Sequence, residues 1–125
     1  MKRDVELIRN IMLHLEEHLV PNSIINARDL SLYDKSSNEE FQVLLEHINQ
    51  LLENELIEAK PLKDLSGLRE FMIFRITSKG YDFLDILRND TVWKDVKEKA
   101  SVVGGFTISL LIDLGKSYLK LKFGL

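Results

Sequence analysis

Residues 14–18 read His-Leu-Glu-Glu-His, and they are the side chains of this chain best suited to chemistry. They match the pattern His-x-x-Glu-His, in which two histidines bind zinc and the glutamate acts as a base. Residues four apart lie on the same face of a helix, so His14 and His18 could contact one metal ion. The functional interpretation of this stretch is a zinc-dependent protease with Glu17 as its base.

The other requirements of such an enzyme have no clear counterpart. A protease needs a third metal ligand and a cleft, and Asp34 and Glu98 are merely two of the 20 acidic residues. A pattern with three fixed positions also arises often by chance. Leu7 and Ile11 share the helical flank of the two histidines, which we therefore place at the border between core and solvent. We expect no catalytic site, no metal site and no cofactor, with adventitious metal binding as the alternative. His47, among polar neighbours, is expected to be solvated.

Hydrophobic periodicity predicts the elements that position these side chains. Residues 3–19 form an amphipathic helix that ends at Pro21. Residues 23–35 are ambiguous and could hold one short strand. Hydroxyl and acidic side chains at 36–40 predict a capped helix start, and the apolar spacing continues that helix to about Asn54.

A β-hairpin follows this helix in the predicted order. Residues 56–59 and 71–77 predict its two strands, with a loop at 61–68. A further helix opens at residues 77–80. The order helix, short strand, helix, strand, strand, helix is that of a winged helix, a variant of the helix-turn-helix plan. We therefore predict a mixed α+β, mostly helical fold, with a winged-helix core over residues 1–89 and a two-stranded wing.

Residues 90–125 are expected to form a C-terminal helical extension that packs on the core, on a dimer partner or on both. Asp90 is the expected cap of its first helix, and Gly104 and Gly105 break that helix. The last helix is predicted from Phe106 to about Phe123.

That last helix is apolar over an arc of roughly 200°, about twice what a one-sided surface helix needs. The domain's own core can cover one flank, and the other flank predicts a symmetric homodimer. Packing of both flanks inside one chain is the alternative. The residues expected at the dimer interface are Leu110, Leu111, Leu114, Tyr118 and Leu121.

A winged helix makes DNA the obvious partner, but the helix that would enter the groove is acidic. The span 36–59 contains six glutamates and no lysine or arginine. Attraction to phosphate supplies most non-specific DNA affinity, so this helix would be repelled. The hairpin is the better candidate, with an ordinary solvated hairpin as the alternative. The residues expected to contact DNA are Lys60, Lys63, Arg69, Arg75 and Lys79.

Several short stretches carry a family resemblance: "MKRD" with "LIR" near the start, "LIEA" in the middle, and "GYDFLD" followed by "DTVWKDVKEKA". In these stretches the chain resembles an uncharacterised bacterial and prophage family, known as a domain of unknown function. The resemblance implies a winged-helix-like core and an intracellular or prophage origin, and it offers no established activity. Similar sequences often have glycine in place of Glu55 and histidine in place of Tyr81. We expect Asn54 to supply the left-handed helix ending instead of a glycine.

Composition narrows the function classes further. The net charge of −3 carries no electrostatic signal for nucleic acid, and an apolar content of 45% is enough for a packed core. The most apolar stretch, 102–121, contains three charged residues, so we expect no membrane span. The lack of cysteine and the charged N-terminus fit a cytoplasmic protein.

We therefore expect a non-enzymatic interaction or regulatory module that forms a homodimer through its last helix. An unidentified protein partner is a further option. The alternative is a DNA-binding transcriptional regulator of prophage origin that contacts DNA mainly through its basic wing.

Overall fold

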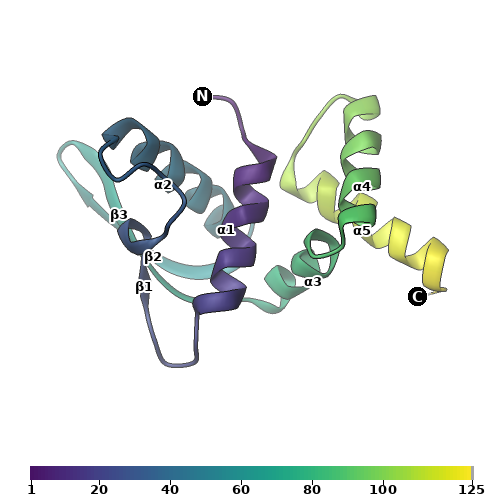
Figure 1. Ribbon diagram of the computed structural model, residues 1–125, viewed down its shortest axis with the longest axis horizontal. Coiled ribbons are helices and arrows are strands. Elements are labelled where there is room, and N and C mark those ends of the chain that lie inside the picture. Colours follow the sequence, from purple (N-terminus) through teal and green to yellow (C-terminus); the bar gives the residue numbers. More distant parts are fainter. Residues whose placement is uncertain (125) are drawn as a thin grey trace. The chain divides into compact units, whose positions relative to one another are not determined.

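The computed structural model describes residues 1–124, which contain five α-helices, one 3-10 turn and a three-stranded antiparallel sheet (Figure 1). The predicted α+β class, with helices predominating, is confirmed. The chain divides into two compact units, Met1–Gly80 and the part from Tyr81 onward. The boundary expected from the sequence was after residue 89.

The first unit combines two helices with the sheet. Its elements, in chain order, are α1 (Val5–His18), β1 (Ile25–Asn26), the 3-10 turn η1 (Ala27–Asp29), α2 (Asn38–Glu53), β2 (Ile57–Asp64) and β3 (Gly67–Ile76). The strand order is β1-β3-β2, and β3 pairs antiparallel with both neighbours. The short strand expected within residues 23–35 is thus confirmed as β1, and it adds a third strand to the predicted hairpin.

The hairpin is longer than its apolar residues indicate. The predicted loop at 61–68 is wrong, because β2 continues to Asp64, β3 begins at Gly67, and those two residues pair across the turn. Pro61 lies inside β2. A proline lacks the N–H that a central strand must donate, and β2 tolerates it because β2 is at the edge of the sheet.

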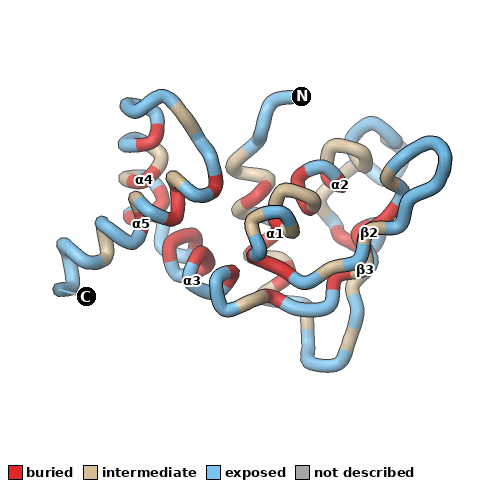
Figure 2. Tube along the Cα trace, turned by 180° about the vertical axis from the view of Figure 1, so that it is seen from behind, coloured by how far each residue is buried: buried red, intermediate tan, exposed pale blue. Residues whose placement is uncertain are grey.

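Both helices of this unit begin at side-chain caps and bury one apolar face. Asp4 accepts hydrogen bonds from the backbone N–H groups of Glu6 and Leu7, and Ser37 accepts one from Glu40. Contacts join α1 to α2, and α2 to β2 and β3. Figure 2 shows the buried residues recurring along one side of each helix. The fully buried apolar residues of the two helices are Ile8, Ile11, Met12, Leu15, Leu44, Leu45, Ile48 and Leu51.

The segment that follows α2 turns in a left-handed conformation. Glu55 has a φ of +62°, whereas Asn54 has an ordinary φ of −90°. The expectation that Asn54 supplies the left-handed ending is therefore wrong, and Glu55 supplies it one residue later. A side chain in this region costs roughly 1–2 kcal/mol relative to the right-handed conformation, and glycine avoids that cost.

Thr77 and Gly80 connect the end of β3 to α3 (Ser78–Leu87). The Thr77 hydroxyl donates to the Glu55 carbonyl at 2.6 Å and accepts from the Gly80 N–H at 3.0 Å. A Cβ on Gly80 would lie 2.1 Å from the Leu56 carbonyl oxygen. Only glycine permits this approach of helix to backbone, which explains the Thr-x-x-Gly spacing.

The second unit consists of the rest of α3, α4 (Asp90–Val103) and α5 (Ile108–Phe123). Asn89, not the predicted Asp90, caps α4, because its side chain accepts from the N–H groups of Thr91 and Val92. Gly104 ends α4 at a φ of +89°, as predicted.

Contacts join α5 to α4, and a glycine brings α5 close to α3. A Cβ on Gly115 would lie 2.3, 2.5 and 2.8 Å from three carbon atoms of the Ile86 side chain. Gly115 itself is buried. The α5 helix therefore presents its Gly115 side to the core of this unit.

Candidate interaction surfaces

The rings of the two histidines of α1, His14 and His18, lie side by side. Their ring centroids are 4.3 Å apart, and about half of the His18 side chain is exposed. Partial burial lowers the pKa of His14 below its ordinary value, and His18 lowers it further, while Glu17 opposes both. Within residues 1–124, no three side chains of the types that ligate metals gather closely enough to hold an ion.

His47 of α2 is fully buried, so its predicted solvated position is wrong. Its Nε2 accepts the backbone N–H of Asp4 at 2.8 Å, and its Nδ1 lies 2.8 Å from the Val43 carbonyl. This arrangement requires the neutral ring with the proton on Nδ1. His47 thus ties the start of α1 to α2 across 43 residues of sequence, and no local pattern could have revealed it.

The outward face of α2 remains acidic in three dimensions. Glu39, Glu40, Glu46 and Glu53 are exposed, and within residues 1–124 none of them forms an ion pair with a lysine or arginine. Arg3 reaches this helix, and its Nε donates to the Gln50 side chain at 2.7 Å. In the described part of the chain these four carboxylates are therefore not neutralised by ion pairs, and Arg3 is a cation that lies against the helix.

The two arginines of the hairpin are neutralised by neighbouring carboxylates. Arg75 contacts Glu58 through Nε and Nη2, each at 2.8 Å, and this contact lowers the pKa of Glu58. Arg69 lies 2.9 Å from Asp64. The pKa of Asp64 is lowered first by the Ser66 N–H and then by Arg69.

The three lysines predicted to contact DNA are placed differently. Lys60, Lys63 and Lys79 are all exposed, and none has an ion-pair partner among the described residues. Lys60 is on β2, opposite Met72, and Lys63 is close to the turn. Lys79 is in the first turn of α3, where it helps to line a cavity of about 720 Å³ at the base of the hairpin. Of the five predicted cations, the two arginines are therefore paired with carboxylates, and the three lysines have no ion pair within the described residues.

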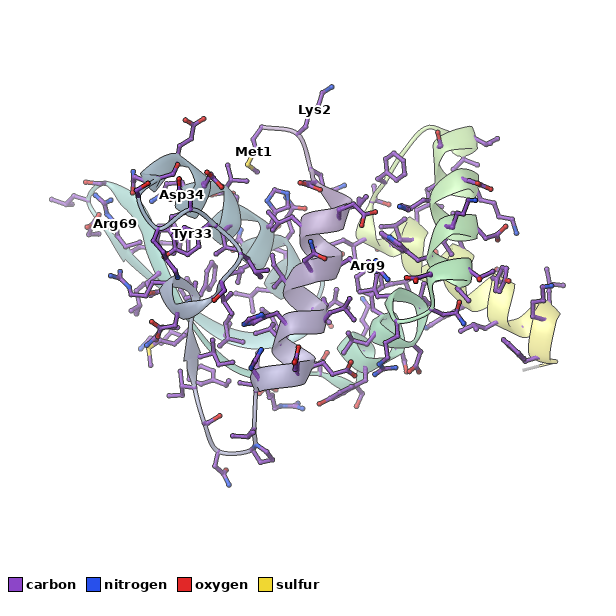
Figure 3. The ribbon with its side chains drawn as sticks, viewed as in Figure 1. Met1, Lys2, Arg9, Tyr33, Asp34 and Arg69 are labelled. Atoms are coloured by element: carbon purple, nitrogen blue, oxygen red, sulfur yellow. The ribbon has the colours of Figure 1, made fainter. Side chains whose placement is uncertain are left out.

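A second cavity, of about 340 Å³, lies at the start of α2 and is lined by Arg28, Lys35 and Arg69. Figure 3 shows the Tyr33 and Arg69 side chains on the same side of the first unit, and Tyr33 also lines the cavity. Each of its cations is already engaged. The Arg28 Nε lies 2.7 Å from the buried Glu70 carboxylate, and the Lys35 Nζ donates to the Leu30 carbonyl at 2.9 Å. The cations of this cavity therefore tie the chain together and are not available as a free basic cluster.

The apolar residues of α5 divide into two stripes. An inner stripe is buried and consists of Ile108, Leu111, Ile112 and Gly115. An outer stripe is at or near the surface and consists of Leu110, Leu114, Tyr118 and Leu121. Of the predicted interface residues, Leu111 thus belongs to the inner stripe, and the other four form the outer one. Figure 2 shows the C-terminal turns of α5 as largely exposed.

Exposure within the outer stripe increases toward the C-terminal end of α5. Leu110, Leu114 and Tyr118 are half-buried, whereas Leu121 is 83% exposed. Lys99 of α4 and Lys122 lie 5.9 and 6.0 Å from the Tyr118 ring, which places cations on that flank. Leu121 therefore continues the half-buried residues of the outer stripe onto the exposed end of α5.

Comparisons with known proteins give a family but no activity. A family model described as "Hypothetical protein (DUF2513)" matches residues 2–107. The chain is similar to an "Uncharacterized protein" of Haemophilus influenzae, with 36% identity over 99 residues, which cover 78% of this chain and 76% of the relative. No solved structure matches the chain. Within the described residues, no helix is both long and apolar enough to cross a membrane.

Proposed function

Because the chain belongs to the DUF2513 family of hypothetical proteins, we propose a function from its surfaces: a non-enzymatic interaction module that self-associates through the outer stripe of α5. The regulatory role is part of this proposal. The observation that carries it is the separation of α5 into two apolar stripes. The inner stripe packs into the core of its own unit, and we assign the outer stripe to contact with a partner.

A winged-helix assignment for residues 1–89 is the second part of the proposal. The order α1, β1, α2, β2, β3, α3 supports it, as does the extended β2–β3 hairpin. The single 3-10 turn η1 would then occupy the place of the middle helix of the motif. In such a domain the α2 helix would face DNA, and its four exposed glutamates oppose that use.

The self-association proposal is tested by one substitution with a matched control. Leu121→Glu places a charge in the outer stripe, and Phe123→Glu places the same charge on another side of α5. Both residues are well exposed, at 83% and 64%, so neither variant should unfold. Light scattering should give a dimer mass for the parent and for Phe123→Glu, and a monomer mass for Leu121→Glu. A parent that stays monomeric at high concentration would refute the proposal.

DNA binding through the hairpin is the second candidate. It is favoured by the three lysines that lack ion-pair partners in the described chain, Lys60, Lys63 and Lys79. Three phosphate contacts would make log K fall with log salt at a slope of about −2 to −3. A gel shift at low salt that is lost in Lys60→Glu/Lys63→Glu would support this function. The absence of any shift at low salt would remove it.

A further inference from the structure

The three leucines of the outer stripe, together with Ser117, have the spacing of a two-helix seam. Leu110, Leu114, Ser117 and Leu121 follow one another at intervals of four, three and four residues. This is the a/d spacing by which two helices pack side by side. Tyr118 borders one edge of the seam, and Asp113 and Lys120 border the other.

We propose that two copies of α5 pair antiparallel along this seam, with Asp113 of each copy forming an ion pair with Lys120 of the other. This inference rests on the self-association proposed above and names the partner as a second copy of the chain. The charges beside the seam indicate that the partner is a second copy of α5, because Asp113 and Lys120 complement each other in one orientation of the two helices only.

The seam is self-complementary about its centre. A two-fold axis between residues 115 and 116 places Leu110 opposite Leu121 of the second copy, and Leu114 opposite Ser117. Every layer of the seam then contains at least one leucine. Such a contact uses the same surface on both copies, as a closed dimer requires.

The charges favour this orientation over the parallel one. Asp113 and Lys120 are both exposed, and within residues 1–124 neither has an ion-pair partner. In the antiparallel pair, the two-fold axis is perpendicular to the plane that contains both helices. It brings the same flank of the two helices together and makes the helices run in opposite directions. Asp113, which precedes the axis in the sequence, then lies beside Lys120 of the other copy, which follows it. This contact occurs twice in each dimer. A parallel pair would bring opposite flanks together, and Asp113 would face the Tyr118 side instead.

The surroundings of the seam also leave the charged flank accessible. Lys99 of α4 approaches the Tyr118 ring at 5.9 Å, so α4 lies toward the Tyr118 flank. Asp113, Ser117 and Lys120 are all exposed on the opposite flank. A second helix can therefore approach on the side where the complementary charges lie.

Single cysteines test the orientation, since the natural chain has none. In the antiparallel pair the two copies of residue 121 are about 16 Å apart along the helices. A disulfide needs Cα atoms within roughly 7 Å, so Leu121→Cys should not cross-link with itself. It should cross-link with Leu110→Cys when the two variants are mixed under oxidising conditions. Ser117→Cys is close to the axis and should cross-link with itself, which makes it the control for association.

The outcomes separate the two proposals. Cross-linking of Leu121→Cys with itself, in a protein of dimer mass, would overturn the antiparallel pair and leave self-association standing. A monomeric protein in which Ser117→Cys does not cross-link would overturn both.

A charge exchange tests the ion pairs themselves. Asp113→Lys alone and Lys120→Glu alone each place like charges opposite one another and should weaken the dimer about tenfold, given two exposed pairs. An equimolar mixture of the two variants restores both opposite-charge contacts in a heterodimer. Sedimentation should therefore show that the mixture associates almost as tightly as the parent. A mixture no tighter than either variant alone would refute the proposed pairing.

Discussion

Gly115 lets α5 approach α3, and Gly115→Ala tests whether that approach orients α5. The added Cβ would lie 2.3 Å from Ile86 Cδ1, 2.5 Å from Cγ1 and 2.8 Å from Cγ2. Rotation of the terminal methyl cannot relieve all three contacts, because Cγ2 is attached directly to the branched Cβ. The helix or the isoleucine must therefore move.

The expected loss of stability follows from two opposing effects. Overpacking of a tight core costs about 1–3 kcal/mol, and three short contacts place this site at the upper end. Alanine recovers about 1 kcal/mol relative to glycine through its higher helix propensity. We therefore expect Gly115→Ala to lower the free energy of unfolding by about 2 kcal/mol in urea titrations, where helix propensity alone would raise it.

Two further variants make this measurement decisive. Gly105→Ala is the control, because a Cβ added at Gly105 would have no atom within 4 Å, and the stability should hardly change. Ile86→Ala removes the contacted atoms, so the double variant Gly115→Ala/Ile86→Ala should be more stable than the sum of the single effects implies. If Gly115→Ala is stabilising, or if the two effects simply add, Gly115 does not pack on Ile86 and the assignment of the inner stripe is wrong.

Three other predictions concern the first unit. Glu55→Gly should raise the free energy of unfolding by about 0.5–1 kcal/mol because it relieves a left-handed φ. Glu46→Gly, at an exposed position in the middle of α2, should lower it by about 1 kcal/mol. Equal effects of the two variants in urea titrations would contradict the turn geometry. His47→Leu should cost about 1–3 kcal/mol, because it leaves the Asp4 N–H without its acceptor, and a variant as stable as the parent would show that this bond contributes nothing. The lowered pKa of His14 means that the folded state favours its neutral ring. The contribution of His14 to the stability is therefore fully present above its ordinary pKa of 6.5, and it is lost as the pH falls through the lower pKa of the folded state. His14→Gln should therefore lose less stability than the parent as the pH falls from about 7.5 to about 5, and an unchanged pH profile would contradict the shift.

The helices with strong apolar periodicity could be predicted from the sequence almost residue by residue. Residues 3–19 and 38–54 were expected, and Val5–His18 and Asn38–Glu53 are observed. Their buried faces follow directly from side-chain spacing. The ends were harder, because a cap depends on backbone geometry. Asn89 and Asp90 are both good caps by type, and only the hydrogen bonds show that Asn89 acts.

The features that sequence reasoning missed depend on contacts between distant residues. The hairpin extends beyond its apolar residues because backbone pairing to β3 holds β2 as far as Asp64. His47 is buried because it accepts the Asp4 N–H, 43 positions away. The division of α5 into two stripes required knowing that α3 contacts the Gly115 side. The helix pattern alone predicted a wide apolar arc and could not say that Leu111 belongs to its inner part.

The central claim, that α5 carries a surface for a second copy of the chain, is tested most directly by the mass of the protein in solution. Sedimentation equilibrium over a range of concentrations should give the mass of a dimer for the parent chain, which weighs 14.5 kDa as a monomer. Leu121→Glu should shift that equilibrium to the monomer, and Phe123→Glu should not. A parent that sediments as a monomer at every concentration, or a Leu121→Glu variant that dimerises like the parent, would contradict the claim.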